Sequence, residues 1–458
     1  MSRRILRGGV LPDRPELGTV DILVDDGRIA GLGPAGSIAL SDGDSLLPLD
    51  GMWVLPGFID AHVHPIHSES MSSVGREGVL GGVTTVLNHL YPTPDETLAE
   101  AVRRNAADSR DAASDFGYHL RITPDRIDMA GAPGHRSALL SAQIIEALTV
   151  GGVVAVKAFL SHADDRVRST LAGLTEILLA GAETGIPVIV HAEPGEVITV
   201  LDGRYGTPES LGEHDRRRSA DLEAAAVALA AATARAVDAR LYVAHLSSDR
   251  AVDAVARARA WGTRVRGESC THYFDLDSGR TLGALGRVTP PLRGPDSMAR
   301  MRELAADSDS GIDVIASDHC GYSAEEKEHT DFALAGNGLP GIDSMAPILI
   351  DAVIAGGWLM AADLVRLTSR GPAEAFGLIG KGRILEGFDA DLVVVDPRGR
   401  GELREHPPGP ATAASPYGGR RLAGSIRRVI RRGSDAVVDG VDHELRDARP
   451  VERTEPEW

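Results

Sequence analysis

The chain has 458 residues, is rich in alanine and glycine, and carries a formal net charge of −18, which argues against a nucleic-acid partner because such a partner binds a basic surface. It contains no apolar run of the roughly 20 residues that cross a membrane, no apolar stretch behind its charged first residues as in a secretion signal, and only two cysteines, too few for a disulfide framework. We therefore expect a cytoplasmic protein, without a membrane or nucleic-acid partner, whose length suits a barrel of roughly 250–350 residues plus a smaller domain.

Short strands and turns fill both ends of the chain. Near the start, ILRGGVL and TVDILVDDGRIAGLG read as strands, and the Asp-Gly pair at residues 26–27 is typical of a hairpin turn. The tail has the same texture, as in GRILEGFDADLVVVD. We therefore predict a small β domain built from both termini, residues 1–54 and 376–458, with a catalytic domain of residues 55–375 inserted between them.

In the middle of the chain, short β-branched runs alternate with alanine- and leucine-rich helical stretches. Strands that alternate with helices pair in parallel through right-handed crossovers, and eight such units close into a (β/α)8 barrel. The expected strands are residues 53–64, 83–90, 116–123, 153–159, 187–193, 240–248, 264–274 and 313–320. Helices are expected over residues 137–149, 170–184, 219–237 and 249–261. The predicted fold class is therefore α/β, with a TIM-like barrel.

Two basic clusters stand out in this pattern, at residues 216–218 and along residues 427–432. Most clusters of this kind are solvated faces. We expect them to lie on such a face or on a strand at the edge of a domain.

Six residues of types that bind metals lie at the ends of the predicted strands. In a barrel of parallel strands, side chains at the carboxyl ends converge on one mouth, where such enzymes keep their chemistry. We therefore predict a hydrolytic centre for two metal ions. Its expected ligands are His62, His64, Lys157, His191, His245 and Asp318.

His62 and His64 are two residues apart on a strand, so their side chains point to the same face. A His-x-His pair alone could equally be structural, and a single histidine at a strand end could be a hydrogen-bonded core residue. His191 and His245 end the fifth and sixth predicted strands in the same way, which favours metal ligation.

Lys157 lies in an otherwise apolar strand, where an ammonium group is costly without a partner. One interpretation is an ion pair with a carboxylate at the mouth, such as Asp318. The other is that CO2 has carbamylated the amine, giving a carboxylate that bridges two metals. Burial beside metal charge lowers a lysine pKa and supplies the neutral amine that this reaction needs. We favour carbamylation, because four neutral histidines and one aspartate would leave two metals without a bridging anion.

Asp318 can bind one metal while its free oxygen handles a proton. Two metals about 3.5–4 Å apart make a bridging hydroxide at neutral pH and polarise a carbonyl. Asp318 would take the proton of this hydroxide as the tetrahedral intermediate forms, acting as general base, and then pass it as general acid to the departing nitrogen. The neighbouring Cys320 is expected to be an inert packed thiol.

The chain resembles the amidohydrolase superfamily, in particular its cyclic-amidase branch of hydantoinases, dihydropyrimidinases, allantoinases and dihydroorotases. The resemblance covers nearly the whole chain, through GRIAGLG, PGFIDAHVH, GGVTTV, VHAE, AHLSS, ESCTHYF, TPPLR, SDHC and GRILEGFDADLVVVD. It implies a barrel joined to a β-sandwich, and two divalent ions, zinc or else manganese or cobalt, bridged by a carboxylated Lys157. By this resemblance, one ion would be held by His62, His64, Lys157 and Asp318, and the other by Lys157, His191 and His245.

Within this branch, dihydroorotases bind the substrate carboxylate through an arginine and an asparagine, whose places here hold Ile66 and Tyr91. Because this carboxylate clamp is missing, dihydroorotate is not an expected substrate. Hydantoinases carry a tyrosine five residues after the lysine; His162 stands there and could still donate a hydrogen bond to the oxyanion. In the related enzymes, the equivalents of Thr289 and Asn337 bind the ring amide. Alternatively, His162 is a solvated loop residue, and Thr-Pro and Asn-Gly are ordinary turns.

The resemblance implies a metal-dependent hydrolase that opens a hydantoin, dihydropyrimidine or imide ring and forms a homo-oligomer, a dimer or a tetramer. An allantoinase that opens a ureide ring is the first alternative. A non-catalytic structural homologue of the same fold is an alternative of another class, although this chain retains every ligand that such homologues have lost.

Overall fold

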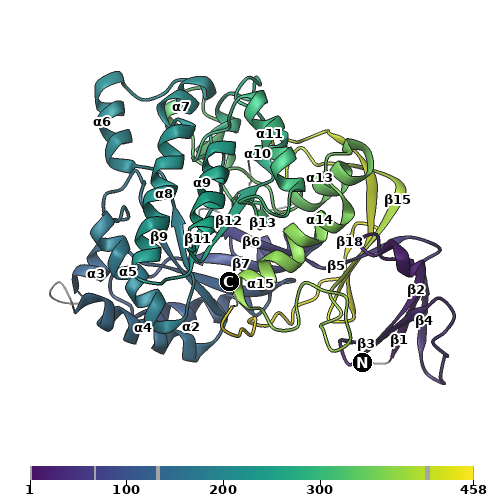
Figure 1. Cartoon of the computed structure of the whole chain (residues 1–458). Coiled ribbons are helices and arrows are strands. Elements are labelled where there is room, and N and C mark those ends of the chain that lie inside the picture. The colour runs from purple at the N-terminus through teal and green to yellow at the C-terminus, as the bar shows by residue number, and fades with distance from the viewer. Residues whose placement is uncertain (1–2, 66–68, 130–134, 408–412, 457) are drawn as a thin grey trace.

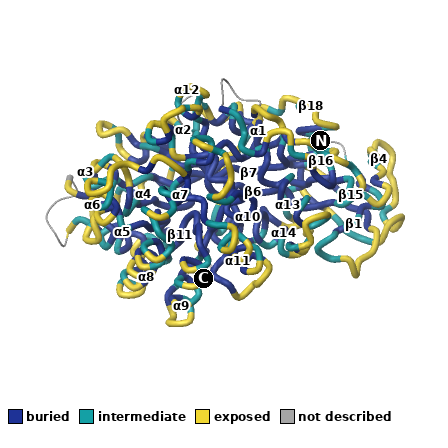
Figure 2. The backbone as a smooth tube through the Cα atoms, turned by 90° about the horizontal axis from the view of Figure 1, so that it is seen from above, coloured by how far each residue is buried: buried dark blue, intermediate teal, exposed yellow. Residues whose placement is uncertain are grey.

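The protein forms a ring of parallel strands wrapped by helices and a separate mixed sheet at one side (Figure 1). The computed structural model describes residues 3–65, 69–129, 135–407, 413–456 and 458. Seen from above, buried chain fills the middle of the ring, and the exposed chain lies around its rim (Figure 2). This arrangement confirms the predicted α/β class, with a TIM-like barrel and a terminal β-sandwich.

The barrel strands follow one another around the ring in chain order, and each is parallel to the next. They are β6 (Phe58–His64), β7 (Val83–Leu90), β8 (Asp115–Arg121), β9 (Val153–Phe159), β10 (Val188–His191), β11 (Leu241–Val243), β12 (Val265–Cys270), β13 (Val314–Ala316) and β14 (His319–Cys320). The eighth strand is interrupted: β13 pairs with β12, whereas β14 pairs with β6 and closes the ring. Asp318 lies in the interruption with a left-handed backbone, at a φ of 50°.

Helices surround the ring on its outer side (Figure 1). They are α1 (Met71–Leu80), α2 (Leu98–Ser109), α3 (Pro124–Met129), α4 (Arg136–Val150), α5 (Leu171–Thr184), α6 (Gly195–Tyr205), α7 (Leu211–Arg217), α8 (Ala220–Ala236), α9 (Asp249–Ala260), α10 (His272–Asp275), α11 (Pro295–Ala306), α12 (Ala324–Lys327), α13 (Met345–Asp351), α14 (Ala361–Val365) and α15 (Gly371–Phe376). The predicted helices are confirmed as α4, α5, α8 and α9. Thr170, Ser219 and Ser248 cap the last three, because each side chain accepts a hydrogen bond from a first-turn amide. Within the described ranges, the helices are all too short or too polar to cross a membrane.

Strands from both ends of the chain build the mixed sheet. They are β1 (Arg4–Val10), β2 (Thr19–Asp25), β3 (Arg28–Pro34), β4 (Ser45–Pro48), β5 (Trp53–Pro56), β15 (Leu392–Glu402), β16 (Arg421–Arg431), β17 (Ser434–Val438) and β18 (Val441–Asp442). The Asp-Gly hairpin is confirmed: Asp26 and Gly27, both at positive φ, join the antiparallel β2 and β3. β5 lies between β1 and β15, so the two termini meet at the centre of the sheet.

The predicted strand over residues 53–64 was wrong as a single element. The structure divides it at Pro56 and Gly57 into β5, which belongs to the mixed sheet, and β6, which belongs to the barrel. A Cβ at Gly57 would lie 2.1 Å from Oγ1 of Thr84, so only glycine allows this close crossing between the sheets. The strand predicted over residues 264–274 also ends early, at Cys270, and its last residues form α10.

A buried ionic cluster joins the amino-terminal end of β8 to the mixed sheet. The ammonium group of Lys381 lies 2.7 Å from Oδ2 of Asp115 and 2.7 Å from Oδ2 of Asp391. Arg431 donates to the other oxygen of Asp115 at 3.0 Å, and Arg432 contacts the same oxygen. The basic run along residues 427–432 was predicted as a solvated face or an edge strand; its last two arginines are instead buried in this cluster.

The predicted domain boundaries, 1–54, 55–375 and 376–458, stay a prediction. In the structure, the mixed sheet includes β5 up to Pro56, and the ring begins at Phe58. The last helix before the returning strands, α15, ends at Phe376.

Candidate functional site

Three of the predicted ligands form one group at the carboxyl end of β6. The Nε2 atoms of His62 and His64 lie 3.1 Å apart. Oδ1 of Asp318 lies 3.3 Å from Nε2 of His62 and 3.4 Å from Nε2 of His64. Asp318 reaches this position because its left-handed backbone breaks the eighth strand beside β6. Two imidazole nitrogens and a carboxylate oxygen form a ligand set that suits a divalent cation such as zinc.

His191 and His245 form a second group at the ends of β10 and β11. Nδ1 of His191 lies 3.0 Å from Nε2 of His245. His245 follows the last residue of β11 by two positions and has a left-handed backbone, at a φ of 41°. Such a conformation is uncommon outside glycine and is concentrated at functional sites. The ring centroids of His245 and His62 are 5.3 Å apart, so the two groups share one mouth.

Lys157 is fully buried at the same end of the barrel, with 0% of its surface exposed. Its Nζ has no hydrogen-bond partner among the described residues, and the ion pair with Asp318 that we considered is not formed there. Burial lowers the pKa of Lys157 to about 8, although the carboxylates of Glu268 and Asp318 act in the opposite direction. An unpaired amine with a lowered pKa reaches the neutral form that carbamylation requires more readily than an ordinary lysine does.

A carboxylate behind the first group fixes the orientation of His62. Glu268, on β12, lies with Oε1 2.6 Å from Nδ1 of His62. The same carboxylate accepts hydrogen bonds from the hydroxyl of Tyr242 at 2.7 Å and from the backbone N–H of His245 at 3.2 Å. Metal-binding histidines commonly donate their other ring nitrogen to such a carboxylate. Glu268 therefore leaves Nε2 of His62 to face His64 and Asp318.

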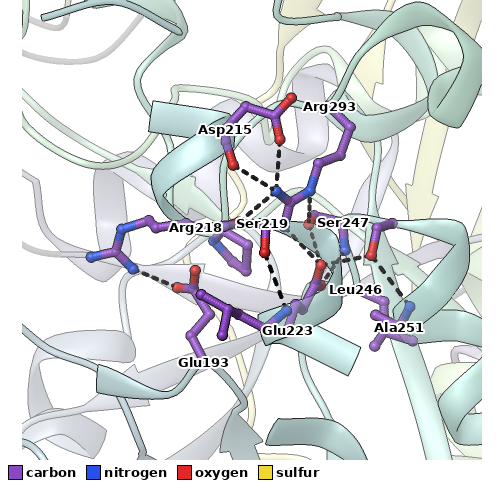
Figure 3. Close-up of polar contacts among 12 residues, drawn as sticks. Glu193, Asp215, Arg218, Ser219, Glu223, Leu246, Ser247, Ala251 and Arg293 are labelled. Atoms are coloured by element: carbon purple, nitrogen blue, oxygen red, sulfur yellow. Dashed lines mark hydrogen bonds and ion pairs between the residues drawn. The ribbon is translucent and has the colours of Figure 1, made fainter. Parts of the chain in front are cut away.

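His191 has an equivalent partner in Glu193, whose contact with Arg218 is drawn in Figure 3. Oε2 of Glu193 lies 2.8 Å from Nε2 of His191, and Nη1 of Arg218 donates to that same oxygen at 2.8 Å. The basic cluster at residues 216–218 was predicted as a solvated face; for Arg218 this was wrong, because its side chain is only 15% exposed and holds Glu193. These contacts leave Nδ1 of His191 to face His245.

A buried polar network holds Arg218 in place (Figure 3). Arg293 donates to the backbone carbonyl of Arg218 at 2.6 Å and to Glu223 at 2.9 Å. Glu223 in turn accepts hydrogen bonds from the backbone N–H and the hydroxyl of Ser247, which lies two residues after His245. The network therefore links the loops that carry both histidines of the second group.

His89 is a site residue that the sequence interpretation missed. Its ring lies 4.4 Å from those of both His62 and His64, and nitrogens of the three rings lie within 4.8 Å of one another. Neither ring nitrogen of His89 has a partner within the described part of the chain, and burial lowers its pKa well below the usual value. The signal was present: His89 is two residues after the inward-facing Leu87, so period two directs it into the barrel.

The predicted substrate contacts lie around the mouth, on loops. His162 is exposed, and its ring lies 5.7 Å from that of Phe159, which stacks on His191. Thr289 is half-buried, and Oγ1 lies 3.5 Å from Nε2 of His214. Asn337 is exposed.

The amide of Gly338 donates to the carbonyl of Arg287, which places the Asn337 loop beside the segment that carries Thr289. Ile66, one of the two clamp positions, lies outside the described residues. The substrate contacts of His162, Thr289 and Asn337 therefore stay predictions.

The donor set fits a pair of divalent ions. Burial lowers the pKa of His62 and His245 well below the usual value, which keeps their imidazoles neutral, as metal ligation requires. Burial also raises the pKa of the Cys320 thiol well above its usual value, which agrees with an inert thiol beside the site.

Comparison with known proteins gives one consistent result. Residues 53–434 match the family model described as the amidohydrolase family. An allantoinase from Solibacter usitatus is 32% identical over 95% of this chain and 93% of its own length, and a D-hydantoinase from Streptomyces coelicolor is 28% identical over 96% and 95%. The crystal structure of dihydropyrimidinase from Brevibacillus agri superimposes over 100% of both chains with a TM-score of 0.87 and 25% identity. The D-hydantoinase from Bacillus sp. AR9 gives the same TM-score at 26% identity, over 99% of this chain and 100% of its own.

Proposed function

Because the chain belongs to the amidohydrolase family, we propose that its barrel mouth opens the ring of a cyclic amide by hydrolysis. The protein is a metal-dependent hydrolase of C–N bonds in small cyclic amides, the class to which the hydantoinases, dihydropyrimidinases and allantoinases among its relatives belong. The finer assignment of ring, metal and residue roles is our proposal.

One observation carries the proposal: a fully buried lysine, whose amine has no hydrogen-bond partner among the described residues, lies beside two groups of histidines and an aspartate. Such a combination would destabilise an ordinary protein core, because each buried polar atom that stays unpaired costs free energy. It is suited to two divalent ions that share a carboxylated Lys157. We propose zinc, or else manganese or cobalt. One ion would be held by His62, His64, Lys157 and Asp318, and the other by Lys157, His191 and His245.

When bound, two such ions would polarise the ring carbonyl and lower the pKa of a water molecule. Asp318 would accept the proton released when the ring carbonyl is attacked and deliver it to the departing nitrogen. Its Oδ1 atom faces His62 and His64, so its second oxygen stays available for this transfer. Through buried hydrogen bonds, Glu268 would hold His62 of the first group, and Glu193 would hold His191 of the second group, in the orientation that a metal needs.

We propose that the ring is recognised by its amide edge, through Thr289 and Asn337, with His162 as a hydrogen-bond donor to the oxyanion. The position of His162 beside Phe159 and His191 supports this role. A hydantoin, dihydropyrimidine or imide ring is the first candidate. A ureide ring of the allantoin type is the second, because the allantoinases among the relatives reach higher identity than the hydantoinases.

The test is a panel of hydantoin, dihydrouracil, allantoin and cyclic imides, assayed with the protein loaded with zinc, manganese or cobalt. Ring opening of at least one member, dependent on the metal, is the expected result. Metal content per subunit separates this function from a non-catalytic homologue, which has no reason to retain two ions. We also propose that the protein forms a dimer or a tetramer. Two exposed apolar side chains, Leu229 on α8 and Trp261 at the end of α9, support this proposal. Light scattering would test it.

A further inference from the structure

Arg121, the last residue of β8, is a cation at the barrel mouth that none of the roles above uses. Its register partner in the neighbouring strand is Lys157, and partners in a parallel sheet project from the same face. His119, two residues earlier, lies inside the barrel, where it contacts the carbonyl of Ala61 and the ring of His89. By the same alternation, Arg121 projects into the mouth, one step above His119.

The guanidinium group of Arg121 has no carboxylate partner. It makes no hydrogen bond or ion pair with any residue that the structure describes, and its Nε is buried and unpaired. It does make a stacking contact: the guanidinium carbon lies 4.5 Å from the ring centroid of Tyr91. The hydroxyl of Tyr91 in turn hydrogen-bonds Nδ1 of His64. Tyr91 therefore lies between the guanidinium group and the first group of ligands.

Asp164, in the loop that follows β9, carries a negative charge that acts on Arg121, but this carboxylate already has a partner. The Asp164 carboxylate binds Arg166 through contacts of 2.7 to 3.1 Å. The same loop presents His162, whose pKa is lowered by burial and also by the charge of Arg121. Asp125 on α3 is a further carboxylate whose charge acts on Arg121, but it makes no hydrogen bond or ion pair with that guanidinium group among the described residues. The donors of Arg121 are therefore available at this side of the mouth.

We propose that Arg121 binds a carboxylate group carried on the substrate ring, so that the enzyme prefers cyclic amides with an anionic side chain. A planar guanidinium fork held against an aromatic ring is suited to bidentate recognition of a carboxylate. Arg121 stacks on Tyr91 and brings its positive charge to the mouth from β8. This inference rests on the proposed function, and it names the class of substrate within it.

The test compares two hydantoins that differ only in charge: the ring derived from glutamate, with a side-chain carboxylate, and the ring derived from glutamine, with an amide in its place. Both are assayed with the metal-loaded wild-type enzyme, Arg121→Met and a matched control, Arg103→Met, which changes an exposed arginine on α2. In the wild type, we expect kcat/KM for the glutamate ring to exceed that for the glutamine ring by about 10- to 100-fold, the range of a charge-assisted hydrogen bond. Arg121→Met should remove this preference by raising KM for the anionic ring, leaving the neutral ring within about twofold. Arg103→Met should keep the preference.

Equal use of both rings by the wild type, or an equal loss on both in Arg121→Met, would overturn the inference while the proposed function stands. If neither ring is opened, the proposed function fails for hydantoins. The role of Arg121 is then tested separately, by measuring how tightly each ring binds. Calorimetric titration of the two rings into the metal-loaded Asp318→Asn variant, with and without Arg121→Met, measures that preference without turnover. Tighter binding of the glutamate ring that disappears in the double variant supports the inference, and equal binding of the two rings refutes it.

Discussion

The Glu268 carboxylate lies 2.6 Å from Nδ1 of His62, and both side chains are buried. This contact determines which nitrogen of His62 faces the first ligand group. Glu193 does the same for His191 from the opposite ring nitrogen, so Nε2 of His62 and Nδ1 of His191 are the atoms left for a metal. The two histidines are thus oriented by different carboxylates through different nitrogens.

Replacing Lys157 by alanine should remove both metal ions and nearly all hydrolysis, because the change deletes the only ligand proposed to be shared. Short carboxylic acids should restore part of the activity by taking the place of the carbamate. Metal content per subunit and activity, with and without added acetate or propionate, are the measurements. An unmodified lysine seen by intact mass or crystallography beside two full metal sites would contradict the carbamate.

Asp318→Asn should keep the fold and some metal but lose ring opening. The expected loss in kcat is at least the roughly 10²–10⁴-fold typical of general acid–base catalysis, because the amide cannot accept the proton. Asp309→Asn, which alters an exposed carboxylate before the same strand, is the matched control and should behave as wild type. Turnover near the wild-type rate in Asp318→Asn would place the base elsewhere.

Arg218→Met should weaken metal binding at the second ligand group, because Glu193 loses the cation that holds it against His191. Removing a partner of this kind typically costs about 10- to 100-fold in metal affinity. Competition with a chelator, followed by metal content, reports this directly and without turnover. Arg216→Met, which changes an exposed arginine of the same helix, should leave the affinity unchanged. Wild-type affinity at both sites in Arg218→Met would show that Glu193 does not depend on Arg218.

Asp115→Asn should destabilise the protein at neutral pH and make its stability depend less on pH in the acid range. Burial disfavours the Asp115 anion, but Lys381, Arg432 and Arg431 outweigh it and lower the pKa of this carboxyl. Since the folded pKa lies below the unfolded value of about 3.9, the stabilisation is present above that value and is lost as the pH falls through the folded pKa.

Breaking such a buried pair costs about 3–5 kcal/mol. Thermal unfolding at matched scan rates should therefore show a large drop in Tm for Asp115→Asn at pH 7. The drop should become smaller as the pH is lowered below about 4. A Tm difference that stays constant with pH would contradict the assignment.

The sequence was sufficient for the parts of the site that depend on local periodicity. His62, His64, Lys157, His191 and His245 lie at or near strand ends because short apolar runs predict the strands, and parallel strands bring their carboxyl ends together. Four of the helices were predicted for a similar reason, since alanine- and leucine-rich stretches separate these strands.

The residues that orient the ligands could not be found in this way. Arg218 lies in a run of three arginines, where a solvated face is the ordinary interpretation, and its burial depends on contacts with Glu193 and Arg293 from distant segments. The break at Gly57 was missed because an apolar run continues through it. Only the packing of Thr84 against that position shows that two sheets part there.

The order of strands in the mixed sheet has a consequence for biosynthesis. β5 is complete before the barrel is translated, but its antiparallel partner, β15, follows the barrel in the chain. Each barrel strand, in contrast, pairs with a strand made shortly before it, except where β14 closes onto β6. On the ribosome, the edge of β5 that later pairs with β15 therefore stays unpaired while the whole barrel is translated. Such an unpaired edge can mispair. We expect nascent chains arrested before β15 to carry a folded barrel and an open amino-terminal sheet that chaperones recognise.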